Sequence, residues 1–238
     1  MTTIKLFCIP YAGGSAVIFN RWKHFIDAKI EIIPIELAGR GKRINEPLYK
    51  DVREVIEDVY RIISKELNGL PYAMFGHSMG SMISYQLGQK FRNNHYPKPQ
   101  HMFFSGRSAP HIKRMDEKKY HLLDEEEFKR AIITLGGTPP EFFDHPELLE
   151  VFLPMLKNDF KLAETEIQNG EIHPLDCNIS VFLGKDEDLT TEQCDGWKRH
   201  TKKLCNIHYF EGGHFFLHDE MEQIVKIINN TLLSDIYS

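Results

Sequence analysis

Residues 71–87, PYAMF-GHSMG-SMISYQL, decide the fold of this chain. The first five are typical of an apolar strand, and residues 82–87 are typical of an apolar helix. Between them, the pattern G-x-S-x-G places Ser78 at the tip of a sharp strand-to-helix turn, the arrangement called a nucleophile elbow. Gly76 and Gly80 flank the serine because the chain passes too close to itself there for a larger side chain. The stretch predicts a nucleophilic serine; the alternative is a glycine-rich turn with an idle one.

A histidine near the C-terminus is in position to act as the base that such a serine needs. His214 follows a predicted strand at 206–210, and Gly212 and Gly213 free the loop in which it lies. It also comes after the serine and after a candidate acid, which is the order Ser, Asp, His that distinguishes α/β-hydrolases from other serine hydrolases. The chain has 12 His, so residue type alone does not single out His214. Its position after the serine and after the candidate acid does.

The candidate acid lies in the turn Gly184-Lys-Asp-Glu-Asp188, directly after a predicted strand at 178–183. A carboxylate there can hold the imidazole in the required tautomer and stabilise the imidazolium formed during attack. Asp186 and Asp188 both qualify. Glu187 is a weaker third candidate, because its side chain is expected to point away from the histidine. The alternative is an acidic surface turn with no catalytic role.

Two backbone amides are candidates for an oxyanion hole, which takes one donor after the nucleophile and one from a loop after an early strand. Met79 supplies the first. The second comes from residues 10–15, a loop with a Gly-Gly pair that follows a predicted strand at Ile4–Ile9. Within that loop, the amide of either Ala12 or Tyr11 can donate. The patterns G-x-x-x-x-G-K-[ST] and G-x-G-x-x-G are both absent, so we expect no nucleotide and no other cofactor.

Strand and helix patterns alternate along most of the chain, which predicts an α/β fold, with a mostly parallel central sheet and helices on both faces. Further predicted strands lie at 31–35 and 101–105, and an amphipathic helix is predicted at 51–67. From about 108 to 176 the alternation gives way to helical patterns, which predicts a helical cap or lid over the active site. The chain has 238 residues and is 42% hydrophobic, so we expect one α/β-hydrolase domain, 1–238, with that cap inserted.

Composition and motifs argue against several other classes of protein. The formal charge is −5 and the basic residues are scattered, so nucleic acid is not an expected partner. We find no signal-peptide pattern and no apolar stretch near the ~18 residues of a spanning helix, and we therefore expect a cytoplasmic protein without membrane contact. The four cysteines lack zinc-ligand spacing, and His214 to His218 has phenylalanine at the second position of H-E-x-x-H, so we expect no metal.

Taken together, these motifs resemble those of the type II thioesterases, free-standing α/β-hydrolases that work beside nonribosomal peptide synthetases and polyketide synthases. The resemblance covers the chain from about 6 to about 227. The stretches that carry it are 8–15, 36–40, 76–80, 135–139 and 212–216. The resemblance implies hydrolysis of acyl thioesters on the phosphopantetheine arms of carrier domains, which removes aberrant or stalled acyl groups.

The resemblance also implies roles for particular residues. By position these are the nucleophile Ser78, the base His214, the acid Asp186, and the amides of Ala12 and Met79 as the oxyanion hole. Asp186 is chosen because its interval to Trp197 matches the interval usual in the family. A chain-terminating fatty acyl-carrier thioesterase and a general carboxylesterase would use the same triad. A non-catalytic binding protein on a hydrolase scaffold would usually have lost a triad member, and this chain retains all three.

The expected partners are acyl-phosphopantetheine carrier domains (ACP or PCP). The resemblance implies that these domains are acidic, whereas this chain is itself net negative, so docking is expected to need a local basic patch. Two clusters qualify: Arg40, Lys42 and Arg43, and Lys113, Arg114, Lys118 and Lys119. The oligomeric state stays open, with a monomer as the expectation.

Overall fold

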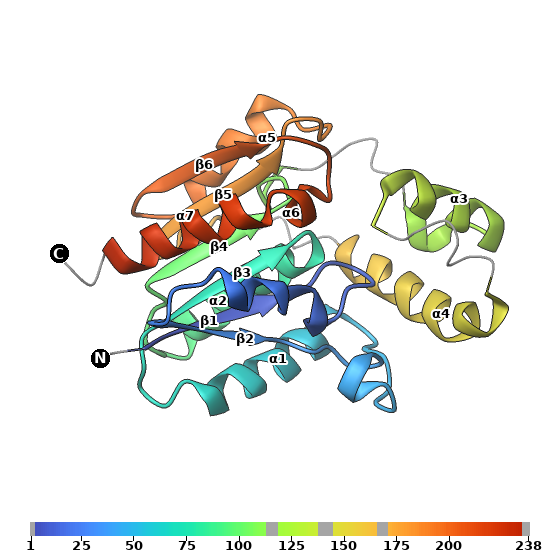
Figure 1. Ribbon diagram of the computed structural model, residues 1–238, viewed down its shortest axis with the longest axis horizontal. Helices are drawn as coiled ribbons and strands as arrows, with labels where there is room; N and C mark the ends of the chain where they lie inside the picture. Colours follow the sequence, from blue (N-terminus) through green and yellow to red (C-terminus); the bar gives the residue numbers. More distant parts are fainter. Residues whose placement is uncertain (1–2, 113–118, 138–144, 166–170, 235–238) are drawn as a thin grey trace.

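A single parallel sheet organises the part of the chain that the structure describes. The structure, a computed structural model, describes residues 3–112, 119–137, 145–165 and 171–234. Within them, six parallel strands follow the spatial order β2-β1-β3-β4-β5-β6 (Figure 1). Their bounds are β1 Ile4–Ile9, β2 Ile30–Pro34, β3 Tyr72–His77, β4 His101–Ser105, β5 Asn178–Gly184 and β6 Cys205–Phe210. The predicted α/β class with a parallel central sheet is confirmed.

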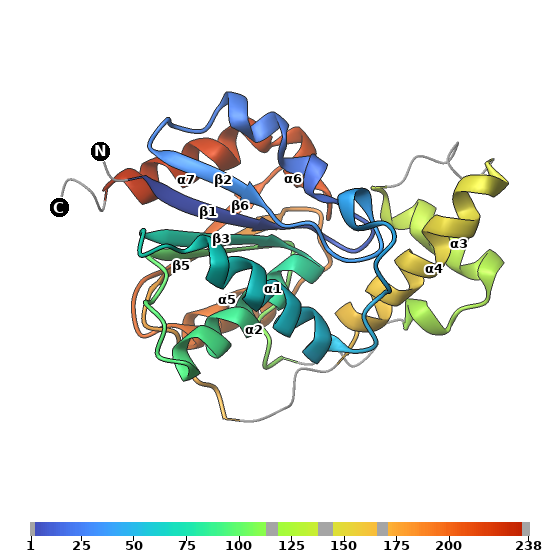
Figure 2. The same ribbon diagram turned by 90° about the horizontal axis from the view of Figure 1, so that it is seen from below.

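Helices cover both faces of this sheet. One face carries α1, α2 and α5, and the other carries α6 and α7 together with the short 3₁₀ helices η1 (Ala16–Phe19) and η2 (Arg21–His24) (Figure 2). The α-helix bounds are α1 Val52–Glu66, α2 Met79–Asn93, α3 Glu125–Leu135, α4 Pro146–Ala163, α5 Thr191–Asp195, α6 Phe216–Asp219 and α7 Met221–Ser234. Across the described ranges, none of the helices combines the length and apolarity needed to span a bilayer.

The strand β1 shows why both faces of the sheet are apolar. Successive side chains of a strand point to opposite faces. Phe7 and Ile9 therefore join the core that includes α1 and α2, whereas Leu6 and Cys8 join the core that includes α7. A parallel sheet covered on both sides buries its strands completely, and all residues of β1 are buried.

The strand order fixes where a site can form. After β1 the chain passes to β2 at one edge and then returns to β3 on the other side of β1. Loops that leave the sheet at such a reversal diverge, and ligands of α/β proteins bind there, at the carboxyl ends of the strands. Gly76 at the end of β3 pairs with Ile9 at the end of β1. The loop after β1 and the turn after β3 thus start side by side.

Two helices stand apart from the sheet at this end, between β4 and β5 in the chain (Figure 1). We refer to η4 (Tyr120–Leu122), α3 and α4 as the cap helices. They form a small apolar cluster of their own, which includes Phe128, Ile132 and Leu153. Both α3 and α4 lie within the stretch from about 108 to 176 for which the sequence predicts helices. Parts of the predicted cap at 113–118, 138–144 and 166–170 lie outside the described residues, and the division into one domain with a cap stays a prediction.

Candidate active site

Ser78 lies at the sharp turn that the sequence predicts between β3 and α2. Its backbone has φ 53° and ψ −112°, a combination that residues other than glycine rarely adopt and that marks functional sites. A Cβ atom at Gly76 would lie 2.1 Å from the carbonyl oxygen of Gly80, and one at Gly80 would lie 2.2 Å from that of Ile9. Only glycine fits at either position. Ser78 is partly exposed, whereas its neighbour Met79 is fully buried.

A hydrogen-bond network under the elbow holds this strained turn. The Ser78 amide donates to the Ser105 carbonyl at 2.8 Å. The Ser81 hydroxyl lies 2.7 Å from the Gly76 carbonyl oxygen and 2.8 Å from that of Ser105, and it accepts from the Ser105 amide at 2.9 Å. Ser81 therefore ties the start of α2 to the ends of β3 and β4. The sequence patterns assigned Ser81 no role.

The imidazole of His214 is held by Glu187. His214 follows β6, and its Nδ1 lies 2.7 Å from Glu187 Oε1. The other carboxylate oxygen, Oε2, accepts a hydrogen bond from the Gly184 amide at 2.8 Å. The Glu187 side chain is only 7% exposed. With both oxygens occupied, the carboxylate has a fixed orientation, and because Nδ1 is engaged, Nε2 is the ring nitrogen available to a serine.

The structure does not bring Asp186 to His214, which corrects the assignment made from the family interval. Asp186 and Asp188 are both exposed, and the Asp186 amide donates to the Gly212 carbonyl at 3.1 Å. The Glu187 amide donates to the Gly184 carbonyl at 3.3 Å, so residues 184–187 form a tight turn. In a turn, side chains do not alternate as they do in a strand. The turn folds the Glu187 carboxylate back over its own start, where His214 lies.

The elbow and the histidine loop meet at His77. The ring centroids of His77 and His214 are 5.1 Å apart. His77 is completely buried, with Nδ1 2.8 Å from the Ser105 hydroxyl. Burial, helped by the nearby His214, lowers the pKa of His77 well below its ordinary value. The loss of hydration on burial therefore disfavours the charged form of His77, which lies beside His214.

The loop that follows β1 bends over the sheet through a tight turn. The Gly14 amide donates to the Tyr11 carbonyl at 2.9 Å, and Gly13 has φ +80°. The Tyr11 hydroxyl lies 3.0 Å from His218 Nε2 on α6. On the other side of the site, Met79 is the first residue of α2, where backbone amides have no partner within the helix. The oxyanion roles of Ala12 and Met79 stay predictions.

Of the first predicted docking cluster, Lys42 is exposed, whereas both arginines are engaged in ion pairs. Arg40 is 4% exposed and forms an ion pair with Asp159 of α4. Arg43 pairs with Glu46 and Asp58. In the second cluster, the Lys119 ammonium donates at 3.0 Å to the backbone carbonyl of Glu164, which follows the last residue of α4. The other three members, Lys113, Arg114 and Lys118, lie outside the described residues.

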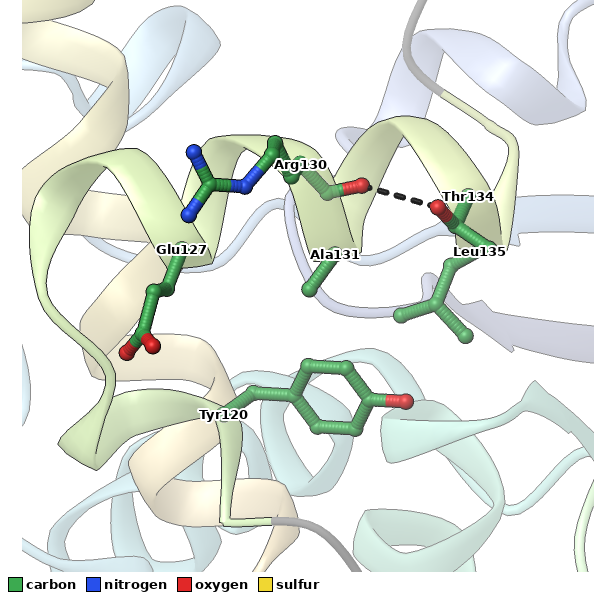
Figure 3. Close-up of a pocket in the computed structure, with 6 residues that line it drawn as sticks. All are labelled: Tyr120, Glu127, Arg130, Ala131, Thr134 and Leu135. Atoms are coloured by element: carbon green, nitrogen blue, oxygen red, sulfur yellow. Dashed lines mark hydrogen bonds between the residues drawn. The ribbon is translucent and has the colours of Figure 1, made fainter.

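Two cavities lie away from this site. A cavity of about 320 Å³ is bordered by one side of α3 and by Tyr120 (Figure 3). A larger one of about 700 Å³ lies beside α1 and α2. Neither is lined by Ser78 or His214. Side-chain geometry, and not cavity volume, therefore locates the candidate active site. In the described part of the chain, no group of three or more His, Cys, Asp or Glu side chains could hold a metal ion.

Known proteins resemble this chain in both sequence and fold. A family model described as a thioesterase domain matches residues 4–232. The chain is 40% identical over 235 residues to linear gramicidin dehydrogenase LgrE from Brevibacillus parabrevis, across 97% of this chain and 88% of that protein. It is 32% identical over 240 residues to the medium-chain S-acyl fatty acid synthase thioesterase of Anas platyrhynchos, across 95% of this chain and 93% of that protein. The crystal structure of ClbQ from the colibactin NRPS/PKS pathway superposes with a TM-score of 0.93 at 32% identity, across 100% of both chains.

The chain belongs to the thioesterase family, and it is a thioester hydrolase. The resemblance to type II thioesterases that the motifs carry is confirmed, and so is the α/β-hydrolase fold.

Proposed function

We propose that this chain hydrolyses acyl thioesters on the phosphopantetheine arms of carrier domains in nonribosomal peptide or polyketide biosynthesis, and so removes aberrant or stalled acyl groups. The observation that carries the proposal is the hydrogen bond from His214 to a fixed, buried carboxylate, next to an elbow that holds Ser78 in a strained backbone conformation. The similarity to ClbQ from the colibactin NRPS/PKS pathway, and to the gramicidin S biosynthesis protein GrsT, supports the pathway class.

The reaction proceeds in two halves through an acyl-serine. Nε2 of His214 takes the Ser78 proton as the hydroxyl oxygen attacks the thioester carbonyl, and the amides of Ala12 and Met79 stabilise the oxyanion. The tetrahedral intermediate collapses, the C–S bond breaks, and the pantetheine sulfur leaves with the proton from His214. In the second half, His214 takes a proton from water, the resulting hydroxide attacks the acyl-serine, and the free acid leaves as Ser78 regains its proton.

Glu187 is the acid of this mechanism. Its carboxylate fixes the tautomer with the proton on Nδ1, so that Nε2 can act as base, and it stabilises the imidazolium. Glutamate is one methylene longer than aspartate. The tight turn at 184–187 compensates, because it folds the longer side chain back toward His214.

Two other activities fit the same machinery. The similarity to a fatty acid synthase thioesterase favours, as a second candidate, release of mature fatty acyl chains from a carrier. LgrE is named a dehydrogenase, but a dehydrogenase activity finds no support in this sequence, because the dinucleotide pattern G-x-G-x-x-G is absent.

A substrate panel tests the proposal. The panel contains short and long acyl groups, each as the carrier-bound thioester, the CoA thioester and a simple oxygen ester. The proposal expects the highest kcat/KM on carrier-bound short acyl groups and no turnover by Ser78→Ala. A preference for long acyl chains supports the fatty acyl alternative, and a preference for oxygen esters supports a carboxylesterase. The cytoplasmic location and the monomeric state stay predictions.

A further inference from the structure

A buried ion pair joins the cap helix α4 to the body of the protein. The side chains of Asp159 on α4 and Arg40 after β2 are 0% and 5% exposed. Nη1 of Arg40 donates to Oδ2 of Asp159 at 2.6 Å, and Nη2 donates to Oδ1 at 2.7 Å. Two parallel hydrogen bonds of this kind fix the orientation of both groups as well as their distance.

The same two side chains also hold the loop after β1. The Gly13 amide donates to Asp159 Oδ2 at 2.7 Å, and Arg40 Nη1 donates to the Gly14 carbonyl at 3.0 Å. The peptide group that contains the Gly13 amide also contains the carbonyl of Ala12, so rotation of that group turns the backbone of Ala12. Asp159 and Arg40 therefore fix the loop directly after the residue whose amide is the proposed oxyanion donor.

The loop is held on its other side as well. Tyr11 precedes Ala12, and its hydroxyl lies 3.0 Å from His218 Nε2 on α6. Ala12 thus lies between one anchor on α6 and another on α4. The anchor on α4 depends on the cap helix being in place, and a Cβ at Gly13 would come within 2.6 Å of Leu156 Cδ1 on the same helix. A side chain at Gly13 would therefore require Leu156 to move, and the positive φ of Gly13 would add backbone strain.

Stability alone is a weak explanation for a charged pair at this position. Replacing a buried ion pair by apolar residues of similar size is often neutral or stabilising, because both charges lose their hydration on burial. Leu156 and Leu162, three residues before and after Asp159, are both buried, so apolar side chains are compatible with this part of α4. What an apolar pair cannot do is accept from the Gly13 amide and donate to the Gly14 carbonyl.

We propose that Asp159 and Arg40 are positioning residues for the oxyanion hole: they hold the loop at 10–15 so that the Ala12 amide meets the transition-state oxygen while α4 is docked on the body. This inference rests on the proposed Ser78 mechanism. An oxyanion donor acts mainly in the transition state, so its displacement lowers kcat more than it raises KM. Loss of one donor costs ~10²–10³-fold in kcat, and a misplacement of about 1 Å costs about 10²-fold.

The experiment compares three variants with wild type on a short acyl-pantetheine thioester, which avoids carrier docking. Asp159→Asn weakens the pair. The double variant Arg40→Met, Asp159→Leu removes both charges, so that no unpaired buried charge is left to prevent folding. Glu164→Gln is the matched control: Glu164 is a buried carboxylate at the end of the same helix, but it accepts from the Tyr120 amide at 2.8 Å within the cap.

Four quantities are measured for each variant: kcat, KM, the rate of fluorophosphonate addition to Ser78, and the denaturant midpoint of unfolding. The phosphonyl oxygen occupies the oxyanion hole during that addition, so its rate reports the hole without the thioester. We expect the folded double variant to lose kcat and phosphonylation rate together, by ~10–100-fold, with KM nearly unchanged and Glu164→Gln close to wild type.

Wild-type kcat in the folded double variant would overturn the inference, and so would an equal loss in Glu164→Gln. Either result leaves the proposed function intact. Turnover by Ser78→Ala would instead remove the proposed function itself, so the two failures are distinguishable.

Discussion

The carboxylate of Glu187 offers the sharpest perturbation of the site, because glutamine has nearly the same shape but carries a donor in place of one acceptor. In the wild type, one oxygen accepts from His214 Nδ1 and the other from the Gly184 amide. Glu187→Gln can satisfy only one of these donors. When its oxygen stays on Gly184, the NH₂ group faces Nδ1 and favours the tautomer with the proton on Nε2. That nitrogen then cannot take the proton of Ser78.

The size of the loss follows from this tautomer argument. Replacing the orienting aspartate by asparagine in the best-studied serine protease lowers kcat by about 10⁴, also through the wrong tautomer. His214 is 29% exposed, so water can offer Nδ1 another acceptor and recover part of the activity. We therefore expect kcat to fall by ~10²–10⁴, or about 3–5 kcal/mol of activation free energy.

The assay measures kcat and KM on a short acyl-pantetheine thioester, with circular dichroism to confirm folding. Asp186→Asn is the matched control, because Asp186 is an exposed carboxylate in the same turn. It should retain nearly full turnover. The reasoning is refuted if Glu187→Gln keeps a kcat close to wild type, or if Asp186→Asn loses the larger share.

Three further predictions concern stability. Gly76→Ala brings a Cβ to 2.1 Å from a backbone oxygen, so the unfolding free energy should fall by about 3 kcal/mol or more in a denaturant titration. The control is Gly213→Ala, which has nothing within 4 Å of its new Cβ and should change the unfolding free energy little. Equal effects of the two substitutions would count against the close approach at Gly76. Ser81→Ala leaves the buried Ser105 amide without its acceptor and should cost ~1–3 kcal/mol, a value that an unchanged denaturant midpoint would contradict. Burial lowers the pKa of His200 to about 4. Between about pH 6.5 and 4 the unfolded chain therefore binds more protons than the folded protein, so the unfolding free energy should fall with falling pH by up to ~1.4 kcal/mol per pH unit. His200→Gln should flatten that slope.

The elbow could be predicted from sequence because its constraints are local. Gly76, Ser78 and Gly80 lie within five residues, and the strand and helix patterns beside them fix the turn. His214 also followed from chain order, since strands β3, β5 and β6 all end at the same edge of a parallel sheet. The fold, and the placement of Ser78 and His214 on loops at that edge, could thus be predicted from the sequence.

The carboxylate that contacts His214 could not be predicted in the same way, because this contact depends on the shape of a turn. The choice between Asp186 and Glu187 depends on whether residues 184–187 continue the strand or fold back, and the hydrogen bond that closes this turn is not encoded by residue type. An interval to Trp197 cannot replace that geometry, because a one-residue difference in the turn changes which side chain faces His214.

The anchor on the cap helix was missed for a different reason. Asp159 and Arg40 are 119 residues apart in the chain, and nothing local to either predicts the other. One signal was present: Asp159 falls on the apolar stripe of α4, seven residues after Phe152 and three after Leu156. A carboxylate on such a stripe needs a buried partner. The partner could not be named from sequence, because twenty-nine Lys and Arg residues were available.

The account as a whole depends on a covalent acyl group on Ser78, and trapping that group is the most direct test. Wild-type enzyme is mixed with an acyl-carrier thioester, quenched in acid at short times, and examined by intact-mass and peptide mass spectrometry. We predict a mass increase equal to the acyl group on the peptide that contains Ser78, and its absence in Ser78→Ala. Slower hydrolysis should make the adduct easier to capture in Glu187→Gln whenever deacylation is the slower half. Acid release by Ser78→Ala at the wild-type rate, or an acyl group on another residue, would contradict the account.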